Sequence, residues 1–293
     1  MHDYSLRFAN LALGYEGLPA IQNITGTIQK GSLTAIIGPN GSGKSTLLKG
    51  IAGILAPLSG SCTVEPKARI AYLPQISELD RTFPATVSDL VSLGLWPERG
   101  LFRHHRIEDR KRLTDALGSV GLAGFEKRQL SALSGGQLQR ALFARVILQQ
   151  ANIILLDEPF NAIDATTIDD LLVLINRWHA QKRTVLAVMH DIGLVRNHFP
   201  QAILLNGKLV AWDETEQVLR HTSLLPAQNM GTAGALPGQH AGYPFMNWLH
   251  EWVVSTFCRL RFYAPGALWF ISALFKRLPG WRFFNITPYE SGW

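Results

Sequence analysis

Cysteine and charged residues are both scarce in this chain of 293 residues. The only cysteines are Cys62 and Cys258, which lie far apart, so neither a disulfide framework nor a cysteine-based zinc site is indicated, and a reducing compartment is expected. Charged residues make up 17% of the chain and hydrophobic residues 47%, a balance that predicts a globular protein with a sizeable core.

Three further absences bear on secretion, membranes and nucleic acids. Residues 1–10 show no basic start followed by an apolar core and a small-residue cleavage site, so no secretory signal is expected. The longest uncharged apolar run, residues 262–275, contains 14 residues, whereas a membrane-spanning helix needs about 20. The net charge is +6, but Lys and Arg are dispersed rather than gathered into one run, so no nucleic acid partner is expected.

A glycine-rich segment that matches G-x-x-x-x-G-K-[ST] is the strongest motif present. It reads Gly38-Pro39-Asn40-Gly41-Ser42-Gly43-Lys44-Ser45-Thr46. The apolar residues 33–37 before it predict a buried strand, and residues 46–55 after it predict a helix with one apolar face. The glycines allow successive N–H groups to point at phosphates, Lys44 would lie near the β and γ phosphates, and the Ser45 hydroxyl could bind Mg²⁺. The context favours a nucleotide site over an unoccupied glycine turn.

A second motif consists of two adjacent carboxylates, Asp157 and Glu158, directly after the apolar strand predicted at residues 153–156. At the carboxyl end of a parallel strand they would lie where open α/β sheets bind ligands. Asp157 is expected to hold Mg²⁺ directly or through water, and Glu158 to polarise a water for attack on the γ-phosphorus. The alternative is a pair of exposed loop acids.

The rest of the pattern predicts an α/β fold. Alternating residues in 4–37 predict a small sheet, and residues 61–73 predict two short strands. Helical periodicity follows over about 85–130. Uninterrupted apolar segments at 153–156 and 184–188, with a helix at 171–179 between them, predict a parallel sheet.

A third motif, Leu133-Ser134-Gly135-Gly136-Gln137, precedes a helix predicted over about 136–150, with Ser134 as its N-cap. A serine hydroxyl and glycine N–H groups at a helix N-terminus form an anion-binding nest, although a simple capping turn is the alternative. Because the chain already has one phosphate cradle, a second nest implies the nucleotide of a second subunit. In their order along the chain (residues 38–46, 133–137 and 157–158), the three motifs resemble those of ABC transporter ATPases, and the resemblance covers residues 4–222.

The resemblance implies a P-loop NTPase (RecA-like) core with a small antiparallel β subdomain and an α-helical subdomain at about 85–150, together forming an ATP-binding domain of residues 1–225. It implies that a head-to-tail homodimer binds two ATP molecules with Mg²⁺. The implied nucleotide contacts are Tyr15, residues 38–46, Ser134, Gly135, Gly136, Gln137 and Asp164, where Tyr15 stacks on adenine and Asp164 crosses the dimer interface. The implied Mg²⁺ ligands are Ser45, Gln75 and Asp157, and the catalytic residues are Lys44, Gln75, Glu158 and His190.

Two of these positions have ordinary structural alternatives. Tyr15 could simply be a tyrosine of a small sheet, because aromatic residues are common in strands. A histidine at the end of a strand, as His190 is here, is usually structural. Its position after the strand at 184–188 fits the histidine that contacts the γ-phosphate in the ATPases it resembles.

Further segments are similar to the manganese and zinc uptake subgroup, namely residues 83–91, Gly94, residues 100–103, 190–195 and 204–211. This similarity implies an importer ATPase at the cytoplasmic face of the inner membrane. Its partners would be a separate membrane permease and, indirectly, an extracytoplasmic metal-binding protein. Iron-chelate importers share part of the pattern, and a soluble ABC protein of DNA repair or translation is the alternative from another class. The single P-loop, the glycine-rich segment of residues 38–46, and the lack of sustained heptads disfavour the latter.

The composition changes after residue 225. Residues 226–242 are rich in Gly, Ala and Pro and are expected to form a linker. Residues 243–293 hold five of the eight tryptophans with Arg and Lys between apolar groups. Three interpretations are open for this tail: an interfacial membrane segment, a docking or regulatory appendage, and a non-native extension.

Overall fold

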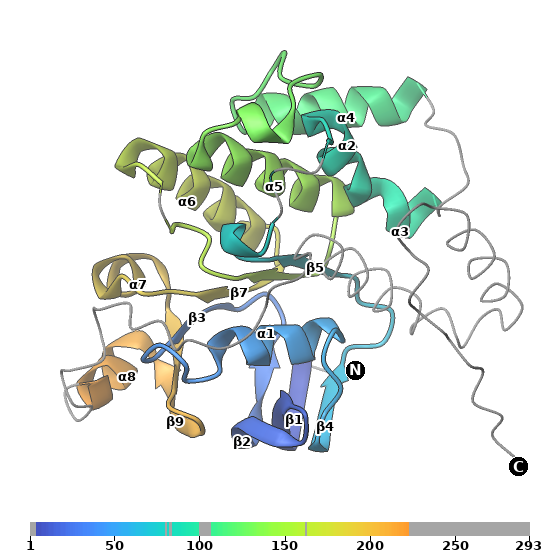
Figure 1. Ribbon diagram of the computed structural model, residues 1–293. Helices are drawn as coiled ribbons and strands as arrows, with labels where there is room; N and C mark the ends of the chain where they lie inside the picture. Colours follow the sequence, from blue (N-terminus) through green and yellow to red (C-terminus); the bar gives the residue numbers. More distant parts are fainter. Residues whose placement is uncertain (1–3, 80, 82–83, 100–106, 162, 223–293) are drawn as a thin grey trace, which may run out of the picture.

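Two β-sheets with α-helices packed around them make up the part of the chain that the computed structural model describes, residues 4–79, 81, 84–99, 107–161 and 163–222 (Figure 1). The smaller sheet is antiparallel, in the order β2 (Leu18–Gln29), β1 (Tyr4–Tyr15) and β4 (Ser59–Val64). The tail and linker predicted after residue 225 lie outside the described residues, as do residue 83 and residues 100–103 of the subgroup pattern.

The larger sheet has six strands, and its first five are parallel. The order is β5 (Ile70–Leu73), β6 (Ile153–Leu156), β7 (Thr184–Val188), β3 (Leu33–Ile37), β8 (Gln201–Leu205) and the antiparallel β9 (Leu209–Glu214). This arrangement, with a small antiparallel sheet and a helical layer, confirms the predicted fold class.

The parallel strands separate two hydrophobic cores. In β6, Ile154 and Leu156 belong to one core, and Ile153 and Leu155 belong to the other. All four residues of β6 are buried, which explains why the sequence shows an unbroken apolar run instead of alternation. The face that carries Leu155 packs on helix α1 (Lys44–Ala52) and the antiparallel sheet, as Figure 1 shows for α1.

Helices on the other face form a separate layer in Figure 1. They are α2 (Val87–Ser92), α3 (Trp96–Arg99), α4 (Ile107–Ser119), α5 (Gly135–Gln149) and α6 (Ala165–Ala180). Helix α8 (Thr215–Thr222) contacts β8 and β9, and α7 (Ile192–His198) packs against α8; both contribute buried residues to the same core as α5 and α6. Short 3₁₀ turns lie at η1 (Ile76–Glu78), η2 (Leu93–Leu95) and η3 (Leu130–Ala132). None of the helices in the described ranges is both long and apolar enough to cross a membrane.

Most predicted element bounds shift by a few residues, although α6 begins six positions before the helix predicted at 171–179, and there is one difference in topology. Helix α1 begins two positions before the predicted start and ends at Ala52, because the next residue, Gly53, has a φ of 75° and caps the helix. The two strands predicted within residues 61–73 both exist, but β4 belongs to the antiparallel sheet and β5 to the parallel one. Spacing along the chain cannot assign a strand to a sheet, because the partners lie far away in sequence.

Candidate functional site

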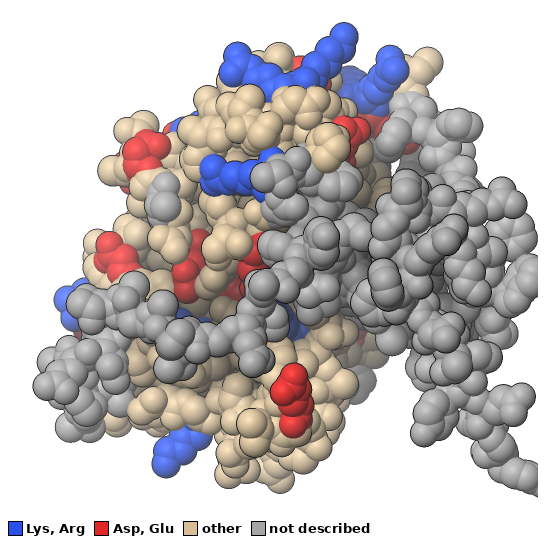
Figure 2. Space-filling view, in the orientation of Figure 1, with Lys and Arg blue, Asp and Glu red and all other residues tan. Residues whose placement is uncertain are grey.

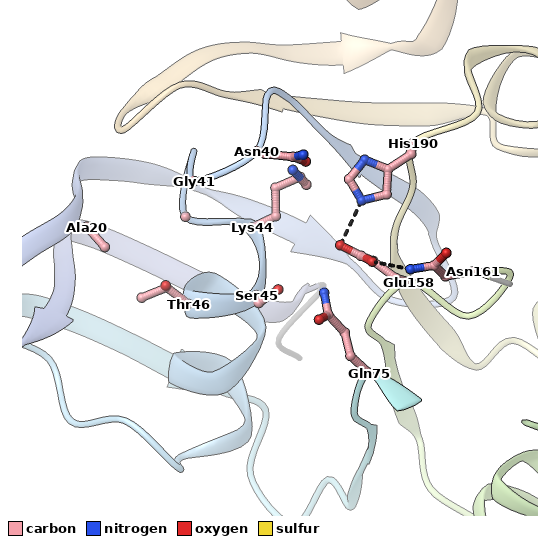
Figure 3. A pocket seen from close by; sticks show the side chains of 11 residues that line it. Ala20, Asn40, Gly41, Lys44, Ser45, Thr46, Gln75, Glu158, Asn161 and His190 are labelled. Carbon is pink, nitrogen blue, oxygen red and sulfur yellow. Dashed lines mark hydrogen bonds and ion pairs between the residues drawn. The ribbon is translucent and has the colours of Figure 1, made fainter. Parts of the chain in front are cut away.

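A cleft of about 540 Å³ opens at the carboxyl ends of β3 and β6, beside the start of α1 (Figure 3). It brings together residues from five separate stretches of the chain. The lining residues are Ala20, Asn40, Gly41, Gly43, Lys44, Ser45, Thr46, Gln75, Glu158, Asn161 and His190. The P-loop, Gln75, Glu158 and His190, which the sequence selects separately, therefore share one cavity.

The P-loop backbone requires glycine at two positions. Gly38 has φ of 148°, and a Cβ there would lie 2.1 Å from the Leu205 carbonyl oxygen. Gly43 has φ of 91°, and its Cβ would lie 2.0 Å from Ile21. The loop is thus packed against β8 and β2 so closely that a larger residue at either position would displace it.

Lys44 is buried, and its ammonium group bonds to the loop that surrounds it. Its Nζ donates to the carbonyl oxygens of Gly38 and Pro39, at 2.9 Å each. Burial lowers the pKa of Lys44, while the negative charges of Glu158 and Asp157 oppose that shift. The loop therefore holds a cation at the cleft before any anion is bound.

Asp157 is fully buried beneath the cleft, and each of its carboxylate oxygens accepts a different hydrogen bond. Ser45 Oγ donates to Oδ1 at 3.0 Å, and the Tyr72 hydroxyl donates to Oδ2 at 3.1 Å. Burial raises the pKa of the Asp157 carboxyl to about 6, against the opposing effect of these bonds. A buried carboxylate beside a hydroxyl supplies the hard oxygen ligands that suit Mg²⁺, so these residues fit the predicted metal.

Glu158 faces the cleft because the backbone turns sharply at this residue. Its φ is 47°, in the left-handed region that residues other than glycine seldom adopt. Its Oε1 lies 2.7 Å from His190 Nε2, and its Oε2 accepts a bond of 3.1 Å from Asn161 Nδ2 (Figure 3). The bond with His190 is the main cause that lowers the pKa of Glu158, so the carboxylate is ionised at neutral pH.

The third motif lies apart from this cleft, at the start of α5. Ser134 caps the helix: its Oγ accepts from the Gln137 N–H at 3.2 Å, and Gln137 Oε1 accepts from the Ser134 N–H at 3.1 Å. A Cβ on Gly136 would lie 3.6 Å from Asp164 Oδ2, so this motif and the predicted interface residue Asp164 are close together. Neither they nor Gly135 line the cleft of their own chain.

The remaining predicted residues also lie outside the cleft lining. Gly38, Pro39 and Ser42 belong to the P-loop but do not line the cleft, and Tyr15, at the end of β1, is 49% exposed. Sequence reasoning missed Asn161, Ala20 and the hydroxyl of Tyr72. Asn161 follows Glu158 by three positions, which is the one signal that could have identified it.

Known proteins similar to this chain are ATP-binding proteins of transport systems. The ABC transporter family profile matches residues 21–161. A manganese transport system ATP-binding protein of Listeria monocytogenes is 43% identical over 218 residues, which are 72% of this chain and 91% of that protein. A zinc transport system ATP-binding protein of Treponema pallidum is 37% identical over 214 residues, 71% of this chain and 80% of that one.

Two solved structures are also similar. One, described as an inward-facing ABC transporter of metal-chelate type, has a TM-score of 0.67 at 31% identity and covers 75% of this chain and 87% of that one. The other, a dimeric bacterial ABC transporter cassette, has a TM-score of 0.64 at 27% identity, with 72% and 98% covered. The fold and the cleft define a P-loop ATPase, and the chain belongs to the ABC transporter family as an ATP-binding cassette that hydrolyses ATP.

The buried Asp157 carboxyl predicts a pH dependence of stability in the absence of nucleotide and metal. Its pKa is about 6 in the folded chain, against 3.8 without burial, so the folded chain binds this proton more tightly. The contribution of this group to the free energy of unfolding is greatest below about pH 4, and about 3 kcal/mol of it is lost as the pH rises through about 6.

Replacing the carboxyl by its neutral amide removes this dependence. We expect Asp157→Asn to be more stable than the wild type at pH 7.5 and to lose that advantage towards pH 4. Urea unfolding in the presence of a chelator, at a series of pH values, measures the difference. A difference that stays constant across this range would contradict the assignment.

Proposed function

We propose that this chain is the ATP-hydrolysing subunit of an ABC importer that takes up a divalent metal ion, zinc or manganese, through a separate membrane permease. The observation that carries the proposal is that Lys44, Gln75, Glu158 and His190 meet in one cleft above a buried Asp157. Binding and hydrolysis of ATP need a cation beside the phosphates, a metal site and a positioned base, and the residues of this cleft fit all three roles.

Each cleft residue has a role in this proposal. Lys44 exchanges its bonds with the loop carbonyls for bonds to the β and γ phosphates. Ser45, Asp157 and Gln75 hold Mg²⁺, which when bound neutralises charge on those phosphates. Glu158 accepts a proton from the water that attacks the γ-phosphorus, while the bond to the bridging oxygen of ADP breaks. His190 exchanges its contact with Glu158 for one with the γ-phosphate.

The cleft is only half of the proposed site. Ser134, Gly135, Gly136 and Gln137 have no role in the cleft of their own chain, yet they present a capped helix N-terminus that suits a phosphate. We propose that they bind the ATP held by the P-loop of a second copy, and that Asp164 lies at the interface between the two chains. Tyr15 would stack on adenine at the exposed edge of β1.

The metal substrate is supported by the relatives, since those named for manganese or zinc transport match most of this chain at 35–43% identity. They support this substrate over an iron chelate, although one similar structure is of metal-chelate type. As a cassette of this family, the chain would act as a peripheral protein at the cytoplasmic face of the membrane, and an extracytoplasmic binding protein would deliver the metal.

A nucleic acid partner has little support. On the face shown in Figure 2, the described Lys and Arg side chains are spread from the upper helices to the lower edge, with Asp and Glu side chains among them. Phosphate backbones are bound by gathered basic residues, whereas this face mixes basic with acidic side chains.

Uptake measurements in a deletion strain test the proposal. We expect uptake of labelled manganese or zinc to fall and to be restored by the wild-type gene but not by Glu158→Gln. Unchanged uptake of both metals, or loss of iron-chelate uptake instead, would contradict the proposed substrate.

A further inference from the structure

Tyr72 lies beside the site without reaching into it. It is the third residue of β5 and is only 5% exposed, and it does not line the cleft. In the parallel register Tyr72 is opposite Leu155, so the two side chains lie on the same face of the sheet. Asp157 follows Leu155 by two positions and therefore points to that face as well. The phenol therefore lies under the carboxylate, on the side where α1 packs.

The Asp157 carboxylate is oriented by two donors from different elements. Ser45, on α1, donates to Oδ1, and Tyr72, on β5, donates to Oδ2. If only Ser45 bonded to it, the carboxylate could rotate about its last side-chain torsion, which has broad energy wells. The bond from Tyr72 removes that freedom and leaves Oδ1 directed towards Ser45.

Tyr72 itself is held firmly. Its carbonyl oxygen accepts a bond of 2.6 Å from Arg145 Nη2, and Arg145 is a fully buried residue of α5. The Asp157 N–H donates to the Leu73 carbonyl at 2.9 Å, which ties the two strand ends together. The phenol and the carboxylate are consequently fixed relative to each other.

We propose that Tyr72 is a positioning residue for the metal that accompanies ATP: its hydroxyl fixes the Asp157 carboxylate so that Oδ1, beside the Ser45 hydroxyl, is presented to Mg²⁺. Tyr72 touches neither nucleotide nor metal and acts through Asp157. This inference rests on the proposed Mg²⁺ site at Ser45 and Asp157. Groups that orient a metal ligand typically contribute about 10–100-fold to metal affinity or activity.

The test compares the affinity of the full-length chain for a fluorescent ADP analogue with Mg²⁺ and with EDTA. For Tyr72→Phe we expect the gain in affinity due to Mg²⁺ to fall by roughly tenfold or more, with the affinity in EDTA unchanged. Tyr4→Phe is the matched control. Ala20 of β2 lines the cleft near the turn of the β1–β2 hairpin, whereas Tyr4 pairs with Gln29 at the other end, so this variant removes a phenol hydroxyl away from the cleft. This control should keep the full gain.

A further variant separates the inference from the function on which it rests. Asp157→Asn should abolish most of the gain due to Mg²⁺. If it does and Tyr72→Phe keeps the wild-type gain, the positioning role is wrong while the metal site stands. If Asp157→Asn also keeps the gain, both are wrong. A purely structural role for Tyr72 would lower affinity equally with Mg²⁺ and with EDTA, and that result would also overturn the inference.

Discussion

The Lys44→Ala variant should bind ATP roughly ten- to a hundredfold more weakly than the wild type, since a hydrogen bond to a charged group contributes about 1.5–3 kcal/mol. The buried ammonium group lies at the cleft, where it bonds to the carbonyls of Gly38 and Pro39. A γ-phosphate and a β-phosphate would offer it far stronger acceptors. Equilibrium titration with ATP measures the loss.

The same variant tests whether Lys44 binds phosphate or only supports the loop. AMP lacks the β and γ phosphates, so its affinity should not change, whereas a collapsed loop would weaken AMP binding as well. Lys44→Arg keeps the positive charge and should retain part of the ATP affinity, although its planar fork fits the loop differently. Unchanged ATP affinity in Lys44→Ala would contradict the proposed role.

The Glu158→Gln variant should lose ATP hydrolysis almost completely while it still binds ATP. A positioned general base contributes typically about 10²–10⁴-fold, and we expect kcat to fall within that range. Glutamine keeps the shape of the side chain and can still bond to His190 and Asn161, so the cleft should keep its form. Steady-state phosphate release and ATP titration together distinguish a lost base from a lost binding site.

A matched control for this variant is Glu65→Gln. Glu65 forms a surface ion pair with Lys30 at 2.6 Å, outside the cleft, and such pairs contribute little to stability. Its kcat should equal that of the wild type. Appreciable steady-state hydrolysis by Glu158→Gln would show that another group acts as the base.

The P-loop, the strand before Asp157 and the Ser134 cap could be predicted from the sequence because each depends on local physics. Glycines that must adopt positive φ, an apolar strand buried on both faces and a serine at a helix start all leave a signal within a few residues. These local signals were sufficient to select Lys44, Glu158 and Ser134.

The support for the site could not be predicted, because it comes from distant parts of the chain. The bond from Tyr72 to Asp157 depends on β5 lying next to β6, and the sequence does not show which strands are neighbours. The left-handed backbone of Glu158 is likewise stabilised by its surroundings and contradicts the ordinary preference of glutamate. Assignment of β4 and β5 to different sheets depends on the same distant pairing.

The proposed function requires that Lys44 and the P-loop of one chain form a complete site only with Ser134 of another. In a Glu158→Gln background, Ser134→Asp tests it, because aspartate preserves the helix cap but places a negative charge against the ATP of the second chain. Thr114→Asp adds the same charge on the exposed face of α4 and serves as the control.

Light scattering with ATP and Mg²⁺ gives the mass of each variant. We predict that Glu158→Gln alone, or with Thr114→Asp, is a dimer, while Glu158→Gln with Ser134→Asp is a monomer that still binds ATP. A dimer of unchanged stability in the Ser134→Asp variant would contradict the claim.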